Sequence, residues 1–288
     1  MGIEKIKINT KKPVEMEVEM KLRELSILAG ENNTGKTFMN IIIWYLYTLF
    51  ATIKILRLQN PNIDNLLQEI EERARTIAKY TFVSDLDIDI IFVDNQGEQY
   101  TLSIFREDGD FDIEFGLDKQ WYDVFYATDN NPLEYASVPI YLTSRVRNFK
   151  TIESYIKTKE LLQLDPSAAE MIIKLSDPSE AEEIEQKFER LCEIFPLYEL
   201  LTMENIVDAI EEYNALQSNS TFQIMKNTML SYIKGDTSEF SMMFPDRFHI
   251  ENGEIYGEYG REKVRLLQIG EGAQSMMITI LLQLTTAV

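Results

Sequence analysis

An eight-residue stretch near the N-terminus constrains the fold more strongly than any other part of the chain. It matches the pattern G-x-x-x-x-G-K-[ST] at every fixed position, and it reads Gly30-Glu31-Asn32-Asn33-Thr34-Gly35-Lys36-Thr37. The apolar residues 25–29 before it predict a short buried strand, and a predicted helix, residues 37–56, follows it. A strand, a glycine-bounded loop and a helix in this order are typical of an α/β fold that binds phosphate groups.

The two glycines explain what such a loop could do. They let the backbone curl until successive N–H groups point at one anion, and the dipole of the following helix adds positive charge. Lys36 is then predicted to reach the β- and γ-phosphates of a nucleotide, and the Thr37 hydroxyl to coordinate Mg²⁺. Asn33 stands where many such loops carry glycine, and asparagine tolerates a left-handed backbone. The predicted nucleotide-binding residues are Gly30, Glu31, Asn32, Asn33, Thr34, Gly35, Lys36, Thr37 and Phe38. The alternative is a glycine turn that only resembles a phosphate loop.

The predicted helix is apolar enough to suggest a membrane span. Residues 38–56 carry few polar side chains, and their length approaches the ~20 residues that cross a bilayer. A helix that is apolar on all sides is equally typical of one buried against a sheet. Because a polar loop leads directly into it, we expect a buried core helix and no membrane partner. The first residues contain no signal-peptide apolar region, which predicts a cytoplasmic protein.

Charge limits the classes of partner. The 288 residues include 28 Lys plus Arg and 48 Asp plus Glu, a formal net charge of −20. An acidic surface repels phosphate backbones, so binding to DNA is not supported except through a local basic groove. Hydrophobic residues make up 45% of the chain, which is enough for a large core and excludes global disorder.

The chain has a single cysteine, Cys192, and a single histidine, His249. An intramolecular disulfide therefore cannot form, and a structural zinc site lacks its usual four Cys or His ligands. A Ser-His-Asp site would have to use His249, but no G-x-S-x-G elbow accompanies it. We expect both residues to be structural.

The loop, preceded by a predicted strand at residues 4–8, resembles that of the ABC-type ATPases of the RecF, SMC and overcoming-lysogenization-defect (OLD) groups, often described as AAA-family ATP-binding proteins. In that family a second, glycine-rich signature opens a helix and contacts the nucleotide of a partner subunit. Residues 266–274, followed by a predicted helix at 275–287, resemble this signature. The signature residues that the resemblance assigns, acting in trans, are Gly270, Glu271, Gly272 and Gln274. Gly270 stands where the better-known signature has a serine.

The resemblance implies a functional cycle. Two heads would sandwich ATP and Mg²⁺, so that ATP favours a homodimer or higher homo-oligomer and hydrolysis releases it. The family context is DNA repair or anti-phage defence, with a nuclease partner or domain. Two alternatives stay open: a P-loop kinase or GTPase, and an interaction module whose nucleotide site is purely structural.

The resemblance also implies a Walker B strand ending in Asp-Glu after the signature helix, yet the sequence ends at Val288. We therefore expect an N-terminal piece of a longer protein that binds nucleotide but hydrolyses it poorly, and no catalytic residue is assigned. Residues 88–94 end in Asp94 and have some Walker B character. They are followed by a turn and by the alternating residues 100–105, so a β-hairpin is the preferred interpretation.

Residues 137–143 predict a core strand leading to Arg145, which becomes a candidate phosphate or interface contact because ligands bind at strand ends. A surface arginine paired with an acidic neighbour is the alternative. Residues 151–234 are predicted to be helical, with Ile184, Phe188, Leu191 and Phe195 on one apolar face. Short strands are predicted at 247–250, 254–258 and 263–267, with a hairpin turn at Asn252-Gly253.

Together these patterns predict an α/β P-loop NTPase, an ABC-ATPase-like head with an antiparallel β-subdomain and a helical insertion. The predicted divisions are a nucleotide-binding lobe with β-subdomain at residues 1–148, a helical insertion at 149–236, and return strands with the signature-like helix at 237–288.

Overall fold

The computed structural model describes residues 3–13, 15–21, 35–59, 63–82, 84–94, 99–107, 110–115, 140–174, 181–234 and 244–286. The fold is mixed α/β with antiparallel sheets. The chain divides into two compact units. Unit 1 comprises residues 1–139, 172–176 and 196–198, and unit 2 comprises residues 140–171, 177–195 and 199–288.

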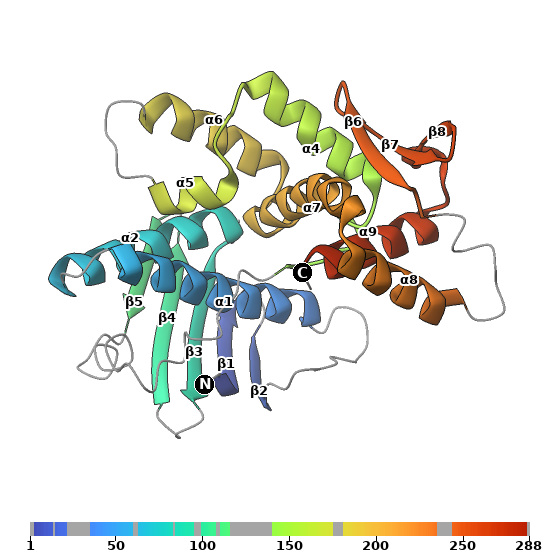
Figure 1. Ribbon diagram of the computed structural model, residues 1–288. Helices are drawn as coiled ribbons and strands as arrows, with labels where there is room; N and C mark the ends of the chain where they lie inside the picture. The colour runs from blue at the N-terminus through green and yellow to red at the C-terminus, as the bar shows by residue number, and fades with distance from the viewer. Residues whose placement is uncertain are drawn as a thin grey trace. The chain divides into compact units, whose positions relative to one another are not determined.

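Unit 1 contains a five-stranded sheet in the order β2-β1-β3-β4-β5, with every neighbouring pair antiparallel. Two helices, α1 and α2, lie across one face of this sheet (Figure 1). The elements are β1 (Ile3–Lys12), β2 (Met16–Lys21), α1 (Lys36–Gln59), α2 (Ile63–Thr81), β3 (Leu86–Asp94), β4 (Gln99–Glu107) and β5 (Asp110–Phe115).

The core of unit 1 lies between the sheet and these helices. Alternate strand residues face it and are buried, because successive side chains of a strand point to opposite faces. Phe92 of β3 is fully buried, with its ring centroid 5.1 Å from that of Phe50 in α1 and 5.1 Å from that of Tyr100 in β4. Other fully buried strand residues are Ile6, Ile8, Leu86, Ile88, Ile90 and Leu102.

Helix α1 is the apolar helix of the sequence. Its window Lys36–Ile53 is long and apolar enough to cross a membrane by length and composition, but 61% of that window is buried within the structure. Tyr45 donates its hydroxyl to the Ala74 carbonyl of α2 at 3.2 Å, as in the packing of a core helix. The helix therefore matches the expected buried helix, and the cytoplasmic location stays a prediction.

The opposite face of the sheet carries ion pairs on β1 and β2. Lys5 pairs with Glu19 at 2.7 Å and Lys7 pairs with Glu17 at 2.8 Å, both between β1 and β2.

Strands β3 and β4 pair antiparallel, with Ile88 opposite Ile104. The hairpin interpretation of this region is thus confirmed.

The predicted helical region is also confirmed. It contains α4 (Phe149–Leu162), α5 (Ala168–Lys174), α6 (Ala181–Ile194), α7 (Leu197–Ala215), a 3-10 turn (Leu216–Ser218) and α8 (Ser220–Lys234). Phe188, Leu191 and Phe195 of the predicted apolar face are buried, and Ile184 is half-buried. Spacing at three to four residues places such side chains on one stripe of the helix.

Unit 2 also contains a three-stranded antiparallel sheet, β6 (Arg247–Glu251), β7 (Glu254–Tyr259) and β8 (Glu262–Arg265), in that order. The turn between β6 and β7 has φ of 51° at Asn252 and 70° at Gly253, as the hairpin prediction requires. Strand β8 is shorter than predicted. Leu266 is fully buried and opens a 3-10 turn, Leu266–Gln268, before α9 (Glu271–Thr286).

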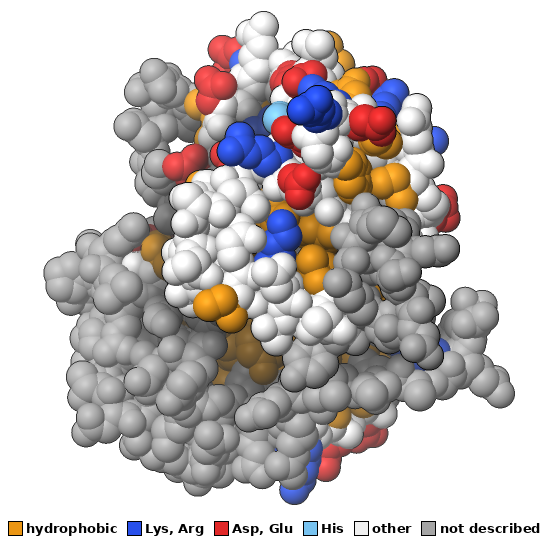
Figure 2. All heavy atoms as spheres, turned by 45° about the vertical axis from the view of Figure 1, so that its right-hand side comes forward, with side chains coloured by type: hydrophobic (Ala, Val, Ile, Leu, Met, Phe, Trp, Pro, Cys, Tyr) orange, Lys and Arg blue, Asp and Glu red, His pale blue; other side chains and the backbone are white. Residues whose placement is uncertain are grey.

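The single histidine lies on this small sheet. His249 Nε2 lies 2.8 Å from Glu258 Oε2 on the neighbouring strand. Figure 2 shows acidic and basic side chains interspersed around the histidine, drawn in pale blue. Among the described residues, its partner is this carboxylate, which fits the expected structural role.

An aromatic cluster joins the small sheet to α7 and α8. The ring centroid of Tyr213 in α7 lies 5.5 Å from that of Phe222, 5.5 Å from that of Phe244 and 5.2 Å from that of Phe248. Its hydroxyl donates to the Pro245 carbonyl at 2.9 Å, and burial raises the pKa of this phenol. The hydrogen bond satisfies the polar end of a side chain whose ring packs against three other aromatic rings.

Candidate functional site

The described part of the predicted phosphate loop begins at Gly35. Residues 25–34, which include the predicted strand and the first five loop residues, lie outside the described residues. Gly35 has φ of 77°, a left-handed conformation that side chains rarely adopt. A Cβ at this position would also lie 3.2 Å from Met16 Sδ in β2. Both the backbone conformation and the close neighbour therefore favour glycine.

Helix α1 begins directly after this glycine. The Gly35 carbonyl accepts the Met39 N–H at 2.9 Å, which closes the first turn. Lys36 is half-buried and Thr37 is exposed, while the Phe38 ring packs edge-on against Phe82 with centroids 6.4 Å apart. The first turn contains no acidic residue. The N-terminal N–H groups of a helix lack intrahelical acceptors and attract an anion, and Lys36 adds a full positive charge there.

The signature-like residues lie at the start of α9, which begins four residues earlier than predicted. The Gly270 carbonyl accepts the N–H groups of Ala273 at 2.9 Å and Gln274 at 3.1 Å. Gly270, Glu271 and Gly272 are exposed. A Cβ built at either glycine would meet no described atom within 4 Å, so the packing of the described chain does not explain them. The Glu271 carboxylate opposes an anion at this helix end.

Gln274 differs from the other three residues of this group. Its side chain is 2% exposed, its Oε1 accepts the Phe149 N–H at 3.1 Å, and its Nε2 donates to the Ile269 carbonyl at 2.5 Å. The side chain is used within its own chain. The structure therefore does not present Gln274 to a second subunit, in contrast to the sequence-based prediction.

The prediction of a strand before Arg145 is wrong for the residues of this segment that the structure describes. Residues 137–139 lie outside the described residues, and residues 140–143 form no strand. The Tyr141 N–H donates to the Thr202 hydroxyl of α7 at 3.1 Å. A side chain from a helix thus takes the backbone hydrogen bond that a neighbouring strand would have made.

Arg145 is paired within its own unit. Its Nη1 lies 3.1 Å from Glu199 Oε2, its Nη2 donates to the Ile194 carbonyl at 3.3 Å, and its guanidinium lies 5.1 Å from the Phe195 ring centroid. The contact with Oε2 is an ion pair without hydrogen-bond geometry. The arginine side chain is 47% exposed and the Glu199 side chain 6% exposed. The structure matches the alternative interpretation of an arginine paired with an acidic neighbour.

Glu199 should make stability depend on pH. Burial raises the pKa of this carboxyl, and the Arg145 charge and the Thr143 hydroxyl partly offset that effect. The folded state then holds the proton more tightly than the unfolded state, so the free energy of unfolding falls as pH rises from 4.5 through the raised pKa. We expect Glu199→Gln to remove this part of the fall, as measured by urea unfolding between pH 4.5 and 7. The exposed Glu193→Gln on α6 serves as the control, and equal profiles for Glu199→Gln and wild type would contradict the assignment.

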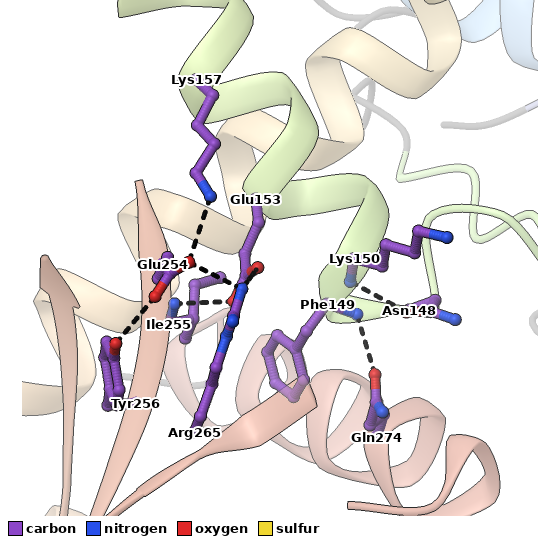
Figure 3. Close-up of polar contacts among 10 residues, drawn as sticks. All are labelled: Asn148, Phe149, Lys150, Glu153, Lys157, Glu254, Ile255, Tyr256, Arg265 and Gln274. Atoms are coloured by element: carbon purple, nitrogen blue, oxygen red, sulfur yellow. Dashed lines mark hydrogen bonds and ion pairs between the residues drawn. The ribbon is translucent and has the colours of Figure 1, made fainter. Parts of the chain in front are cut away.

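A buried polar cluster that the sequence did not predict joins α4 to the small sheet (Figure 3). Glu153 of α4 is 4% exposed; its Oε1 accepts the Ile255 N–H at 3.0 Å and its Oε2 lies 2.8 Å from Arg265 Nη2. Arg265 also contacts Glu254 at 2.9 Å, and Glu254 accepts the Tyr256 hydroxyl at 2.8 Å. The signal available in the sequence was Glu153 itself, four residues after Phe149 on the apolar face of a helix.

A pocket of about 500 Å³ lies between the C-terminal half of α4 and α7. Its lining includes four acidic side chains and one lysine, Lys159, which pairs with Glu204 at 3.4 Å. Burial raises the pKa of Asp208 in the same lining. Such a lining repels phosphate groups, so the pocket does not suit a ligand that carries phosphate.

Neither a scan of protein-family models nor a search of curated proteins finds a match to this chain.

Proposed function

We propose that this chain is the ATP-binding head of an ABC-type, AAA-family ATPase with a P-loop NTPase fold. One observation carries the proposal: the sequence matches the phosphate-loop pattern throughout, and its last glycine has the left-handed backbone from which α1 begins at Lys36. A fortuitous glycine turn would not require a lysine and a hydroxyl residue in the first turn of an apolar helix.

Two further features support the proposal. The antiparallel sheet of unit 1 fits the β-subdomain that the family resemblance implies, and the helices of residues 149–234 fit its helical insertion. The exposed glycines at the start of α9 leave room for a ligand or a second subunit. Lys36 would contact the phosphates and Thr37 would hold Mg²⁺, which neutralises phosphate charge when bound.

ATP would act in this proposal as a ligand that favours a homodimer. Gly270 and Gly272 of one copy would face the phosphate loop of the other, and the paired heads would serve a DNA-repair or anti-phage effector, with a nuclease as partner or domain. A ligand shifts an equilibrium toward the state that it binds more tightly, so ATP that contacts both copies stabilises the dimer. We assign no residue of this chain to hydrolysis.

Light scattering tests this proposal directly. We expect the measured molar mass to be that of a dimer with ATP and Mg²⁺. With ADP or without nucleotide, it should be that of a monomer. A fluorescent ATP analogue measures binding in parallel, with GTP as the competitor that tests base preference. Binding at constant mass would favour the static interaction module, and the absence of any binding would refute the proposal.

A further inference from the structure

We propose that Gln274 is a positioning residue that links the start of α9 to the loop that carries Arg145, and that it does not touch the nucleotide of a partner. Residues 268–272 are called the Gly270 turn, and residues 142–148 are called the Arg145 loop. The inference rests on the proposed function, since it concerns the same signature-like motif.

The side-chain amide of Gln274 bridges two segments that are far apart in the sequence. It points from α9 toward the first residue of α4, where its Oε1 accepts the Phe149 N–H at 3.1 Å (Figure 3). Its Nε2 donates to the Ile269 carbonyl at 2.5 Å, next to the Gly270 turn. With 2% of the side chain exposed, water does not compete for either bond.

The Arg145 loop is built so that a shift of Phe149 would move it as one piece. The Arg147 guanidinium donates to the Leu142 carbonyl at 2.9 and 3.2 Å, closing the loop on itself. The Thr143 hydroxyl accepts the Val146 N–H at 3.2 Å, and the Asn148 side chain caps α4 by accepting the Lys150 N–H at 2.8 Å. The Gln274 bridge reaches this loop at its junction with α4.

Glutamine is suited to this link because its amide carries a donor and an acceptor at a fixed separation. Gln274→Glu keeps an acceptor for the Phe149 N–H, and a carboxylate is favourable at the start of a helix. In its ionised form it loses the donor to the Ile269 carbonyl. Gln274→Met keeps a similar volume and loses both hydrogen bonds. The two variants therefore separate the α4 end of the link from the Gly270 end.

Hydrogen exchange of the nucleotide-free chain tests the link itself. Gln274→Met should speed exchange of the Phe149 amide about tenfold, as expected when one buried hydrogen bond is lost. Gln274→Glu should leave that amide protected and speed exchange of the Ala273 and residue-274 amides, which bond to the Gly270 carbonyl. Gln283→Glu on the exposed side of α9 is the control, and it should leave exchange of the Phe149 and Ala273 amides as in wild type because it changes neither hydrogen bond of Gln274. Wild-type exchange in Gln274→Met would overturn the inference.

Nucleotide binding then separates a positioning role from a general loss of stability. Both Gln274 variants should keep the affinity for a fluorescent ATP analogue within about twofold and form the ATP-dependent dimer about tenfold more weakly. Equal dimer formation in the variants and wild type, or a parallel loss of affinity and melting temperature, would contradict the positioning role. If wild type binds no ATP, the proposed function fails, and the exchange experiment still decides whether Gln274 links the two segments.

Discussion

Lys36→Ala is expected to bind ATP about 100-fold more weakly than the wild-type chain. Lys36 is the first residue of α1 and follows the left-handed Gly35, so it adds a full positive charge to the first turn of the helix. A hydrogen bond to a charged group contributes about 1.5–3 kcal/mol, and each 1.4 kcal/mol is a factor of ten in affinity. The measurement is a titration of the chain with a fluorescent ATP analogue in the presence of Mg²⁺.

Lys79→Ala is the matched control for this loss. Lys79 is an exposed lysine near the end of α2 in the same unit, and its ammonium lies 5.1 Å from the Tyr80 ring centroid. Removing it changes the net charge by the same amount without changing the start of α1. We expect wild-type affinity for this variant. Equal affinity of Lys36→Ala and wild type would show that the glycine turn only resembles a phosphate loop.

Phe92→Ala is expected to lower the free energy of unfolding by about 3–5 kcal/mol, the usual cost of replacing a buried phenylalanine with alanine. The ring is fully buried at the centre of the five-stranded sheet, edge-on to Phe50 and stacked on Tyr100. Its loss removes apolar burial and leaves a cavity between α1 and the sheet. Urea unfolding followed by tryptophan fluorescence measures the change, because Trp44 lies in α1 of the same unit.

Phe105→Ala makes the same chemical change on the neighbouring strand. The Phe105 side chain is 41% exposed, and its removal should cost less than about 1 kcal/mol because little apolar area leaves the core. The contrast between the two variants tests which face of the sheet is buried. Similar losses for both would contradict the packing of α1 and α2 on the Phe92 face.

The sequence predicted the element types well where a local pattern was strong. The mostly apolar residues 88–93, the turn after them and the alternating residues 100–105 predicted the hairpin of β3 and β4, and the Asn252-Gly253 pair predicted the turn between β6 and β7. The apolar residues after Lys36 predicted a buried helix, and α1 is mostly buried. These patterns are local because the repeat of a strand or a helix decides which side chains share a face.

The errors in the prediction arose where a contact from a distant segment changed a local preference. Residues 140–143 have the composition of a strand, yet the Thr202 hydroxyl bonds to the Tyr141 backbone and no strand forms there. Gln274 stands within a motif whose resemblance implied contact with a partner, yet its side chain turns inward to Phe149 and Ile269. Spacing in the sequence predicts neither the contact of Tyr141 with Thr202 nor the contacts of the Gln274 side chain.

The sequence by itself determined the phosphate-loop pattern, the hairpins of β3 with β4 and of β6 with β7, and the chemistry that Lys36 and Thr37 could perform. Tertiary structure decided which polar side chains are used within the chain: Arg145 pairs with Glu199, and Glu153 holds Arg265 and the Ile255 backbone. The reason is physical. Backbone propensity and periodicity depend on near neighbours in the sequence. A buried polar group loses its hydrogen bonds to water and turns toward the protein group that replaces them. Folding brings that group from far along the chain.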